Sequence, residues 1–263
     1  MQSQVPLPSA GFITHTEQKG NTMFRKILVV TALLAIASLA TAADFSCSLW
    51  TQVASRALFN NTGTFGTDGA VLNVVPECTD TKTGFYGNLF LAAPMKNFAN
   101  GKEIDVRLGK RFQLKQVKVD ASAAYYYFGV AGDMYRTGNG RVRVSRMFDV
   151  GHGITVQPYG TADYQRSFSF GTNSLGLAAG AVVESKLASL PGRPTLTADV
   201  SYWRYATTTA TNKGPIVPLD IVLNFPVTDK VTVGLHAMQV WGNVADHSHK
   251  PKHMFGLTMF TMF

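Results

Sequence analysis

The stretch KEIDVRLGKR, residues 102–111, alternates charged and apolar side chains along almost its whole length. Because successive side chains of a β-strand point to opposite faces, Ile104, Val106 and Leu108 would share one face, and the charged residues between them would share the other. Such a strand needs an apolar environment on one side and a polar environment on the other. The period of two therefore predicts a two-faced strand rather than a helix.

The same alternation recurs along the chain, and no convincing 3.6-residue pattern accompanies it. Further examples are VKVDASAAYYY (117–127), ITVQPYGTADY (154–164), TLTADVSYW (195–203), VPLDIVLNF (217–225) and VTVGLHAM (231–238). We predict twelve strands, near residues 45–58, 70–79, 85–93, 103–111, 117–127, 136–148, 154–167, 175–188, 195–206, 216–225, 231–241 and 254–263. A series of two-faced strands of this length predicts an all-β fold.

The last segment, HMFGLTMFTMF at residues 253–263, carries bulky apolar side chains to the end of the chain. In a soluble protein it would form an exposed, sticky edge. The side chains on its apolar face are Phe255, Leu257, Met259, Thr261 and Phe263. We expect this face to meet lipid and the edge to pair with the first strand when a barrel closes.

The connections between the predicted strands tend to alternate in length. Long ones include FNNTGTFGTDG (59–69) and GNVADHSHKPKH (242–253), and short ones include TDTKTG (79–84) and PVTDK (226–230). Short turns at one end, longer loops at the other and an even number of strands are typical of transmembrane barrels. We therefore predict a transmembrane antiparallel up-and-down β-barrel of about twelve strands, with both termini at the short-turn end.

Aromatic residues support two interfacial girdles in this barrel. Those expected at the long-loop end are Tyr125, Tyr126, Tyr127, Tyr202, Trp203, Tyr205 and Trp241, and those at the short-turn end are Phe225 and Phe263. A soluble β-sandwich is the alternative. It would not need an export signal together with an apolar last strand that ends in free aromatic residues.

An export signal precedes the predicted strands. Residues 23–26, MFRK, give a basic start, ILVVTALLAIASLA gives an apolar core of fourteen residues, and Ala40-Thr41-Ala42 gives a cleavage site. The core is too short to span a bilayer. We assign residues 23–42 to a cleaved signal peptide and residues 43–263 to the mature barrel. Residues 1–22 are a mis-assigned start or a disordered extension.

The two cysteines fall opposite each other in the first predicted hairpin. Residues paired across a hairpin have a constant number sum, and a turn centred on Thr62 and Gly63 pairs Cys47 with Cys78. The exported compartment is oxidising. We therefore predict a Cys47–Cys78 disulfide near the inner rim of the barrel, with two free thiols as the alternative.

If the apolar faces meet lipid, the charged faces line the inside of the barrel. The predicted pore-lining residues are Asp105, Arg107, Asp120, Arg141, Arg143, Asp163, Glu184, Asp199, Asp220 and His236. Registers drawn from the turns place Glu184 beside Asp199 and Asp220 beside His236, which makes one wall acidic, with basic residues elsewhere around the ring. Such a wall predicts a pore constriction with a transverse field. A network of ion pairs that fills a narrow lumen is the alternative.

Candidate enzyme and metal sites are weak. The segment ADHSHKPKH brings Asp246, His247 and Ser248 together in sequence, but neighbours on a loop do not make the geometry of a catalytic triad. His247, His249 and His253 could bind a metal, although a solvated polar loop is the simpler interpretation. We expect no catalytic residue, no metal and no cofactor.

Segments between residues 55 and 128 resemble the TorF-like porin family, a largely uncharacterised group of bacterial outer-membrane barrels. The resemblance is carried by SRALFNN (55–61), GFYGNLF (84–90), KEIDVRLGKRF (102–112) and VKVDASAAYYYF (117–128). The sequence departs from the family at Ala57, where the family tends to have Gly, and at LAAPMKN (91–97). The resemblance implies a barrel in the outer membrane, but no substrate and no catalytic residue. The terminal Phe263 also resembles the signal by which such barrels are recognised for insertion.

We expect a passive, porin-like channel for small polar solutes in the bacterial outer membrane. The alternatives are a closed structural or surface-interaction barrel and, third, an outer-membrane lipid hydrolase. Expected partners are outer-membrane lipid, lipopolysaccharide and, during insertion, the barrel-assembly machinery. Lysines at 96, 102, 213, 250 and 252 would form a basic rim beside lipopolysaccharide. Nucleic acid is not an expected partner, because the chain lacks a basic aromatic platform.

Overall fold

The computed structural model describes residues 44–56, 69–95, 102–130, 133–207, 215–242 and 252–263. The predicted N-terminal extension at 1–22 and signal peptide at 23–42 lie outside these residues. Within the described part of the chain, no helix is long and apolar enough to cross a membrane.

The described residues form one antiparallel sheet. Its strands are β1 (Phe45–Ala54), β2 (Val71–Asp80), β3 (Phe85–Pro94), β4 (Glu103–Leu114), β5 (Val117–Val130), β6 (Asp133–Ser145), β7 (Phe148–Gly151), β8 (Ile154–Ser167), β9 (Thr172–Lys186), β10 (Thr195–Thr207), β11 (Val217–Pro226), β12 (Val231–Trp241) and β13 (Lys252–Met262). Apart from the division of the predicted strand 136–148 into β6 and β7, their bounds agree with the predicted strands to within four residues.

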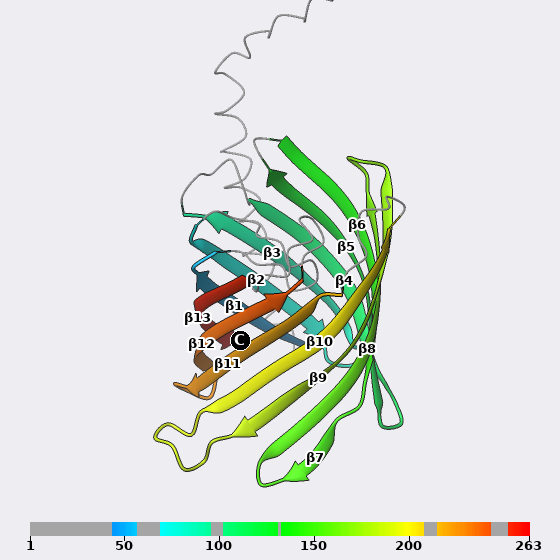
Figure 1. Cartoon of the computed structure of the whole chain (residues 1–263). Coiled ribbons are helices and arrows are strands. Elements are labelled where there is room, and N and C mark those ends of the chain that lie inside the picture. The colour runs from blue at the N-terminus through cyan, green and yellow to red at the C-terminus, as the bar shows by residue number, and fades with distance from the viewer. Residues whose placement is uncertain (1–43, 57–68, 96–101, 131–132, 208–214, 243–251) are drawn as a thin grey trace, which may run out of the picture.

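The sheet closes on itself. The last strand, β13, pairs with β1, and β6 pairs with β8, so every long strand has a neighbour on both sides. In Figure 1 the blue β1 lies beside the red β13. The short β7 only extends the wall beside β8, so the barrel has twelve long strands. The predicted closed antiparallel barrel of about twelve strands is confirmed.

A proline explains why one predicted strand is divided into β6 and β7. Ser145 pairs with Tyr159 and Phe148 pairs with Val156, so the break at residues 146–147 lies opposite Pro158. Proline has no N–H to donate to the ladder. Its carbonyl still accepts a hydrogen bond of 3.2 Å from the Arg146 N–H.

The two ends of the barrel differ. We call the end that carries residues 81–84, 115–116, 152–153, 187–194 and 227–230 the turn end, and the opposite end the loop end. The described chain also starts and stops at the turn end, where the Phe263 N–H donates to the Cys47 carbonyl at 3.0 Å. The expectation of longer connections at the loop end does not hold for all of them. The connections β5–β6 and β8–β9 are short.

The outer wall is apolar and exposed. Leu108, Phe255 and Leu257 are 66%, 64% and 58% exposed, as expected for side chains that face away from the barrel. Alternation then places Tyr126, Trp203 and Tyr205 on the inner wall, so the prediction that these three residues belong to an outer aromatic girdle is wrong. Trp203 is buried, and its ring stacks on that of Tyr205.

Apolar side chains also gather on the inner wall toward the loop end. The buried members of this cluster are Ala54, Val71, Ala92, Trp203, Ile216, Met238, Val240 and Met254. Most come from β1 to β3, β10, β12 and β13, and Ile216 immediately precedes β11, so the cluster follows neighbouring strands around the wall. The sequence predicted that charged residues line the inside of the barrel. The structure shows that the inner wall also has an apolar part, near the loop end.

Candidate functional site on the inner wall

The structure places all ten predicted pore-lining residues on inward positions of their strands. Asp105 and Arg107 lie on β4, Asp120 on β5, Arg141 and Arg143 on β6, Asp163 on β8, Glu184 on β9, Asp199 on β10, Asp220 on β11 and His236 on β12. Contacts between strands that are not neighbours, which only the concave side of a barrel permits, support this placement. An example is the ion pair between Arg143 of β6 and Asp199 of β10. The inner wall is the candidate functional site.

A first inward network joins β2 to β5. Arg111 donates to both carboxylate oxygens of Glu77, at 2.6 and 3.1 Å, and to Asp120 at 3.2 Å. The Tyr86 hydroxyl donates to the other oxygen of Asp120 at 2.7 Å, and the Arg111 guanidinium lies 3.9 Å from the centre of the Tyr86 ring. Every charged group in this network has a close partner, so it stabilises the wall.

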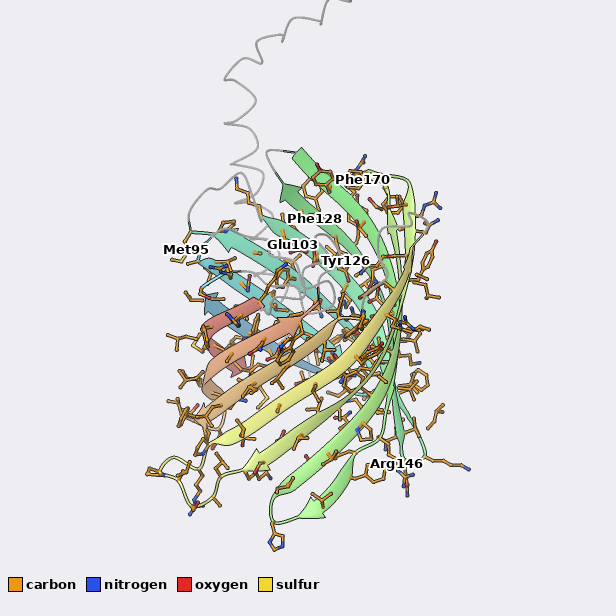
Figure 2. All side chains as sticks on the ribbon, in the orientation of Figure 1. Met95, Glu103, Tyr126, Phe128, Arg146 and Phe170 are labelled. Atoms are coloured by element: carbon orange, nitrogen blue, oxygen red, sulfur yellow. A yellow bond between two sulfur atoms is a disulfide. The ribbon has the colours of Figure 1, made fainter. Side chains whose placement is uncertain are left out.

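A second inward network joins β4 to β8. Arg107 donates to the Tyr126 hydroxyl at 3.1 Å, and Tyr126 donates to the Asn139 carbonyl oxygen at 3.0 Å. Asp163 is fully buried and accepts hydrogen bonds from Asn139 at 2.7 Å and from Arg141 Nε at 2.8 Å. Figure 2 labels Tyr126 on the wall of the barrel, above Arg146, which projects away at the lower end. In this network Arg141 and Asp163 form an ion pair, whereas Arg107 contacts a neutral hydroxyl. Asp105, two residues before Arg107, has one buried carboxylate oxygen without a hydrogen bond from the described residues.

A third group lies around a small cavity of about 80 Å³. The residues that line this cavity, which we call the niche, are Arg141, Arg143, Tyr159, Thr161, Asp199, Ser201, Trp203, Pro218 and Asp220. The Tyr159 hydroxyl donates to Asp199 at 2.6 Å, and the Arg143 guanidinium lies 3.5 Å from the centre of the Tyr159 ring. The ion pair between Arg143 and Asp199 is long, at 3.8 Å.

A fourth set of contacts runs from β2 to β11. Asn73 donates to Gln52 at 2.9 Å, and the Gln52 amide in turn donates to His236 Nδ1. Since Nδ1 accepts, Nε2 carries the ring proton, and it donates to Asp220 at 2.6 Å. This set reaches the edge of the niche.

Two details of the predicted register are corrected. Glu184 pairs with Thr197 and Thr155, and Val182 rather than Glu184 lies opposite Asp199. The β9–β10 turn closes through the Leu187 N–H and the Pro194 carbonyl, which shifts the pairing by two residues. Met238 lies opposite Asp220, although the diagonal contact between His236 and Asp220 forms nonetheless.

The prediction of one acidic wall, with basic residues elsewhere around the ring, is also corrected. Acidic and basic residues are mixed along the inner wall. Asp120 and Asp163 lie among arginines, and Glu77 on β2 adds a carboxylate far from Asp199. Of the inward acidic residues, Asp199 and Asp220 form the one directly opposed pair that the described registers contain.

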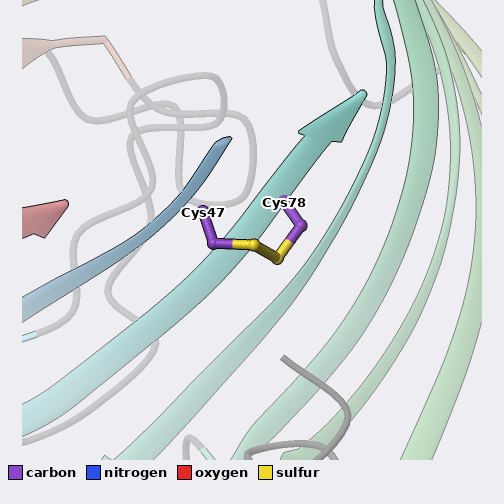
Figure 3. Close-up of a disulfide and its surroundings, with 2 residues drawn as sticks. All are labelled: Cys47 and Cys78. Atoms are coloured by element: carbon purple, nitrogen blue, oxygen red, sulfur yellow. A yellow bond between two sulfur atoms is a disulfide. The ribbon is translucent and has the colours of Figure 1, made fainter. Parts of the chain in front are cut away.

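The structure joins Cys47 to Cys78 by a disulfide, in the register expected from the first hairpin (Figure 3). The bond links the start of β1 to the end of β2 at the turn end. Strand alternation puts both cysteines on the outward face, with Leu49 and Leu72. The disulfide therefore belongs to the wall and not to the candidate site.

Sequence reasoning missed several inward residues. They are Gln52, Asn73, Glu77, Tyr86, Arg111, Asn139 and Tyr159. The alternation of side chains along a strand would have found some of them. Arg111 lies four residues after Arg107, and Tyr159 lies four residues before Asp163, so each shares the inward face of its strand.

Several residues named from the sequence lie outside the described residues. They are Asp246, His247, Ser248 and His249, and Lys96, Lys213 and Lys250. His253, Lys102 and Lys252 are at the loop end. Within the described part of the chain, no three His, Cys, Asp or Glu side chains are grouped to hold a metal.

Among the comparisons with known proteins, the one with solved structures supports the fold. No protein-family model matches the chain. No curated protein matches it either. Among solved structures, the NanC porin has a TM-score of 0.52 at 12% identity, covering 81% of this chain and 98% of that chain. The KdgM porin has a TM-score of 0.51 at 8% identity, covering 82% and 99%.

At these identities the likeness shows the fold alone. The barrel, with its apolar outer wall and polar inner networks, has the architecture of the porin-like outer-membrane barrels.

Proposed function

We propose that this protein is a passive, porin-like channel that admits small polar solutes across the bacterial outer membrane. The observation that supports this function best is the division of the closed barrel into an exposed apolar outer wall and an inner wall with charged residues on β2, β4 to β6 and β8 to β11. Lipid is the solvent that fits the first wall, and water and polar solutes fit the second.

We also propose an outer-membrane location, which is supported by the same division and by the predicted export signal at residues 23–42. In that setting the outer wall contacts membrane lipid, the loop end faces lipopolysaccharide, and the barrel-assembly machinery inserts the chain through a signal that includes Phe263. Membership of the TorF-like porin family is part of this proposal. It is supported by the motifs between residues 55 and 128.

A closed structural barrel is the second candidate, and the apolar cluster favours it. Val71 and Val240 face inward near the loop end and are 0% exposed. Against a fully filled lumen, the side chains of Arg143 and Asp199 are 35% and 33% exposed. The ion pairs therefore do not fill the whole interior, and the niche remains accessible.

A lipid hydrolase is the third candidate, and no specific observation favours it. The inward networks described above contain carboxylates, arginines and tyrosines in mutual hydrogen bonds, without a serine held by His236. We propose that the protein transports without catalysis. Release of fatty acid from labelled phospholipid by the refolded protein would contradict this.

The test is conductance through planar bilayers that contain purified, refolded protein. We expect discrete conductance steps in KCl, and their absence would favour the closed barrel. Because Asp199 and Asp220 are opposed across β10 and β11, the double variant Asp199→Asn/Asp220→Asn removes negative charge from one part of the lumen. Its reversal potential in a KCl gradient should move toward that of chloride.

Asp229→Asn is the matched control, because it removes the same charge from the β11–β12 turn, outside the lumen. Its reversal potential should equal that of the unmodified protein. If the double variant behaves like this control, the inner carboxylates do not set ion selectivity.

A further inference from the structure

The niche on the inner wall contains acceptors and donors that the protein leaves unused. Asp199 and Asp220 lie directly opposite each other on β10 and β11, with both side chains facing inward. Like charges in this position repel each other. One oxygen of each carboxylate has a close partner: Asp199 Oδ1 accepts from Tyr159, and Asp220 Oδ1 accepts from His236. The two Oδ2 atoms have no hydrogen bond of 3.5 Å or less within the described part of the chain.

Arg143 supplies the complementary unused group. Its guanidinium rests on the Tyr159 ring and lies 3.8 Å from Asp199 Oδ2, and the described residues give it no hydrogen bond. The neighbouring arginines differ, because Arg141 contacts Asp163 at 2.6 Å and Arg111 contacts Glu77 at 2.6 Å. Arg143 therefore keeps its donors free for a ligand while its position is held by the aromatic ring.

The barrel contains an internal comparison for this arrangement. In β3 to β5, Tyr86 lies over Gly109 and donates to Asp120, and in β8 to β10, Tyr159 lies over Gly180 and donates to Asp199. Both aspartates are followed two residues later by serine. In the first group the arginine is clamped by two carboxylates, Glu77 and Asp120. In the second group the arginine comes from β6 instead of the glycine strand, and it lacks a counterpart of Glu77, so it is not clamped.

We propose that the niche is a binding site for small zwitterions, that is, for solutes with an ammonium and a carboxylate group close together. The ammonium group binds between the free oxygens of Asp199 and Asp220, which relieves their repulsion. The carboxylate group binds the Arg143 guanidinium. This inference rests on the proposed channel function, because it names the solute class that the channel selects.

The mixture of charges favours a zwitterion over a simple ion. An anion alone would gain Arg143 but approach two carboxylates, and a cation alone would gain the carboxylates but approach Arg143 and Arg141. The long Arg143–Asp199 pair is the contact that a zwitterion would replace with two shorter ones. The volume of about 80 Å³ suits a group no larger than the head of an amino acid.

The experiment uses three probes of the same size, which are glycine, glycinamide and glycolate. Glycine carries both charges, glycinamide only the positive one and glycolate only the negative one. Binding to the refolded full-length mature protein in detergent is measured by calorimetry, which does not depend on conductance. We expect glycine to bind at least tenfold more tightly than either of the other probes.

Variants test whether the niche carries this preference. Asp220→Asn and Arg143→Gln should each weaken glycine binding at least fivefold. Asp229→Asn is the matched control, because it removes the same charge from the β11–β12 turn, away from the niche, and should leave glycine binding unchanged. Each variant is checked for folding by its electrophoretic mobility with and without boiling. If a variant does not fold, the comparison of the three probes on the unmodified protein still decides.

Equal binding of glycolate would overturn the proposal in favour of a site made by arginine alone, and equal binding of glycinamide would overturn it in favour of the carboxylates alone. Absence of glycine binding would also overturn it. If conductance is present without glycine binding, only this inference fails. If glycine binds and no conductance is seen, the site stands and the channel function fails.

Discussion

Asp163 and Asp199 both lie on the inner wall, but they differ in burial and in the distance to their arginine partner. Asp163 is fully buried and is held by Asn139 and by two nitrogens of Arg141. Asp199 is one-third exposed, and its arginine is 3.8 Å away. A buried ion pair depends on both partners, because removal of one leaves an uncompensated charge in a region of low dielectric. The first carboxylate therefore maintains the wall, whereas the second is available for a solute.

The substitution Asp163→Asn should consequently destabilise the barrel. It leaves the buried side of Arg141 without a counter-ion, and loss of one partner of a buried pair costs about 3–5 kcal/mol. The free energy of unfolding in urea, measured on protein inserted in lipid vesicles, checks this. Asp229→Asn in the β11–β12 turn is the control, with an expected change of less than about 0.5 kcal/mol. Equal effects of the two substitutions would contradict a structural role for Asp163.

Three inward tyrosines lie over glycines on the neighbouring strand. Tyr86 pairs with Gly109, Tyr159 with Gly180 and Tyr205 with Gly176. A Cβ atom added to any of these glycines would lie 2.5 or 2.6 Å from the ring of its tyrosine, which is too close. Glycine leaves room for the ring to lie along the wall, and this directs the hydroxyl of Tyr86 and Tyr159 toward an aspartate one strand further on.

The strand pair β8–β9 provides a test of this arrangement. At Gly180 a methyl group would meet the Tyr159 ring and the Val200 carbonyl oxygen, both at 2.6 Å, and a clash with backbone cannot be relieved by a rotamer change. Gly180→Ala should therefore cost about 1–3 kcal/mol in the free energy of unfolding. Gly160→Ala on β8 is the control, because its nearest neighbour would be 3.9 Å away. Similar unfolding midpoints for both variants would show that the tyrosine ring does not need the space.

At the level of elements, alternation alone predicted the strands and their two faces. It could also have corrected the aromatic girdles, since Tyr126 shares the parity of Asp120, and Trp203 that of Asp199. The position of an aromatic residue near a strand end does not decide which wall it lies on, whereas its parity does. The register of Glu184 could not be predicted in the same way, because the residue pair that closes the β9–β10 turn depends on its backbone geometry.

The niche could not be predicted from the sequence. Its residues come from β6, β8, β10 and β11, and the separation of Arg143 from Asp199 depends on the curvature of the closed barrel. The sequence identified Arg143, Asp199 and Asp220 as inward residues. It did not show that Arg111 is held by two carboxylates whereas Arg143 has only one long ion pair among the described residues.

For the molecule as a whole, the proposed function requires that the outer wall meets lipid. Leu235 on β12 and Val227 in the β11–β12 turn are similarly exposed, at 52% and 63%. Leu235 lies near the middle of its strand, opposite Leu223 and Leu257, whereas Val227 lies in a turn between strands. In water the two positions would tolerate a charge equally well. In a bilayer only the turn would.

The substitutions Leu235→Arg and Val227→Arg therefore distinguish the two solvents. Arginine on the lipid face near the bilayer midplane costs about 2–4 kcal/mol, and the cost falls to about 0–1 kcal/mol near the interface. We expect Leu235→Arg to lower the free energy of unfolding from lipid vesicles by the larger amount and Val227→Arg by the smaller. The unmodified protein in the same vesicles is the reference. If both variants unfold at the same urea concentration, the outer wall does not face hydrocarbon, and a channel through the outer membrane is excluded along with it.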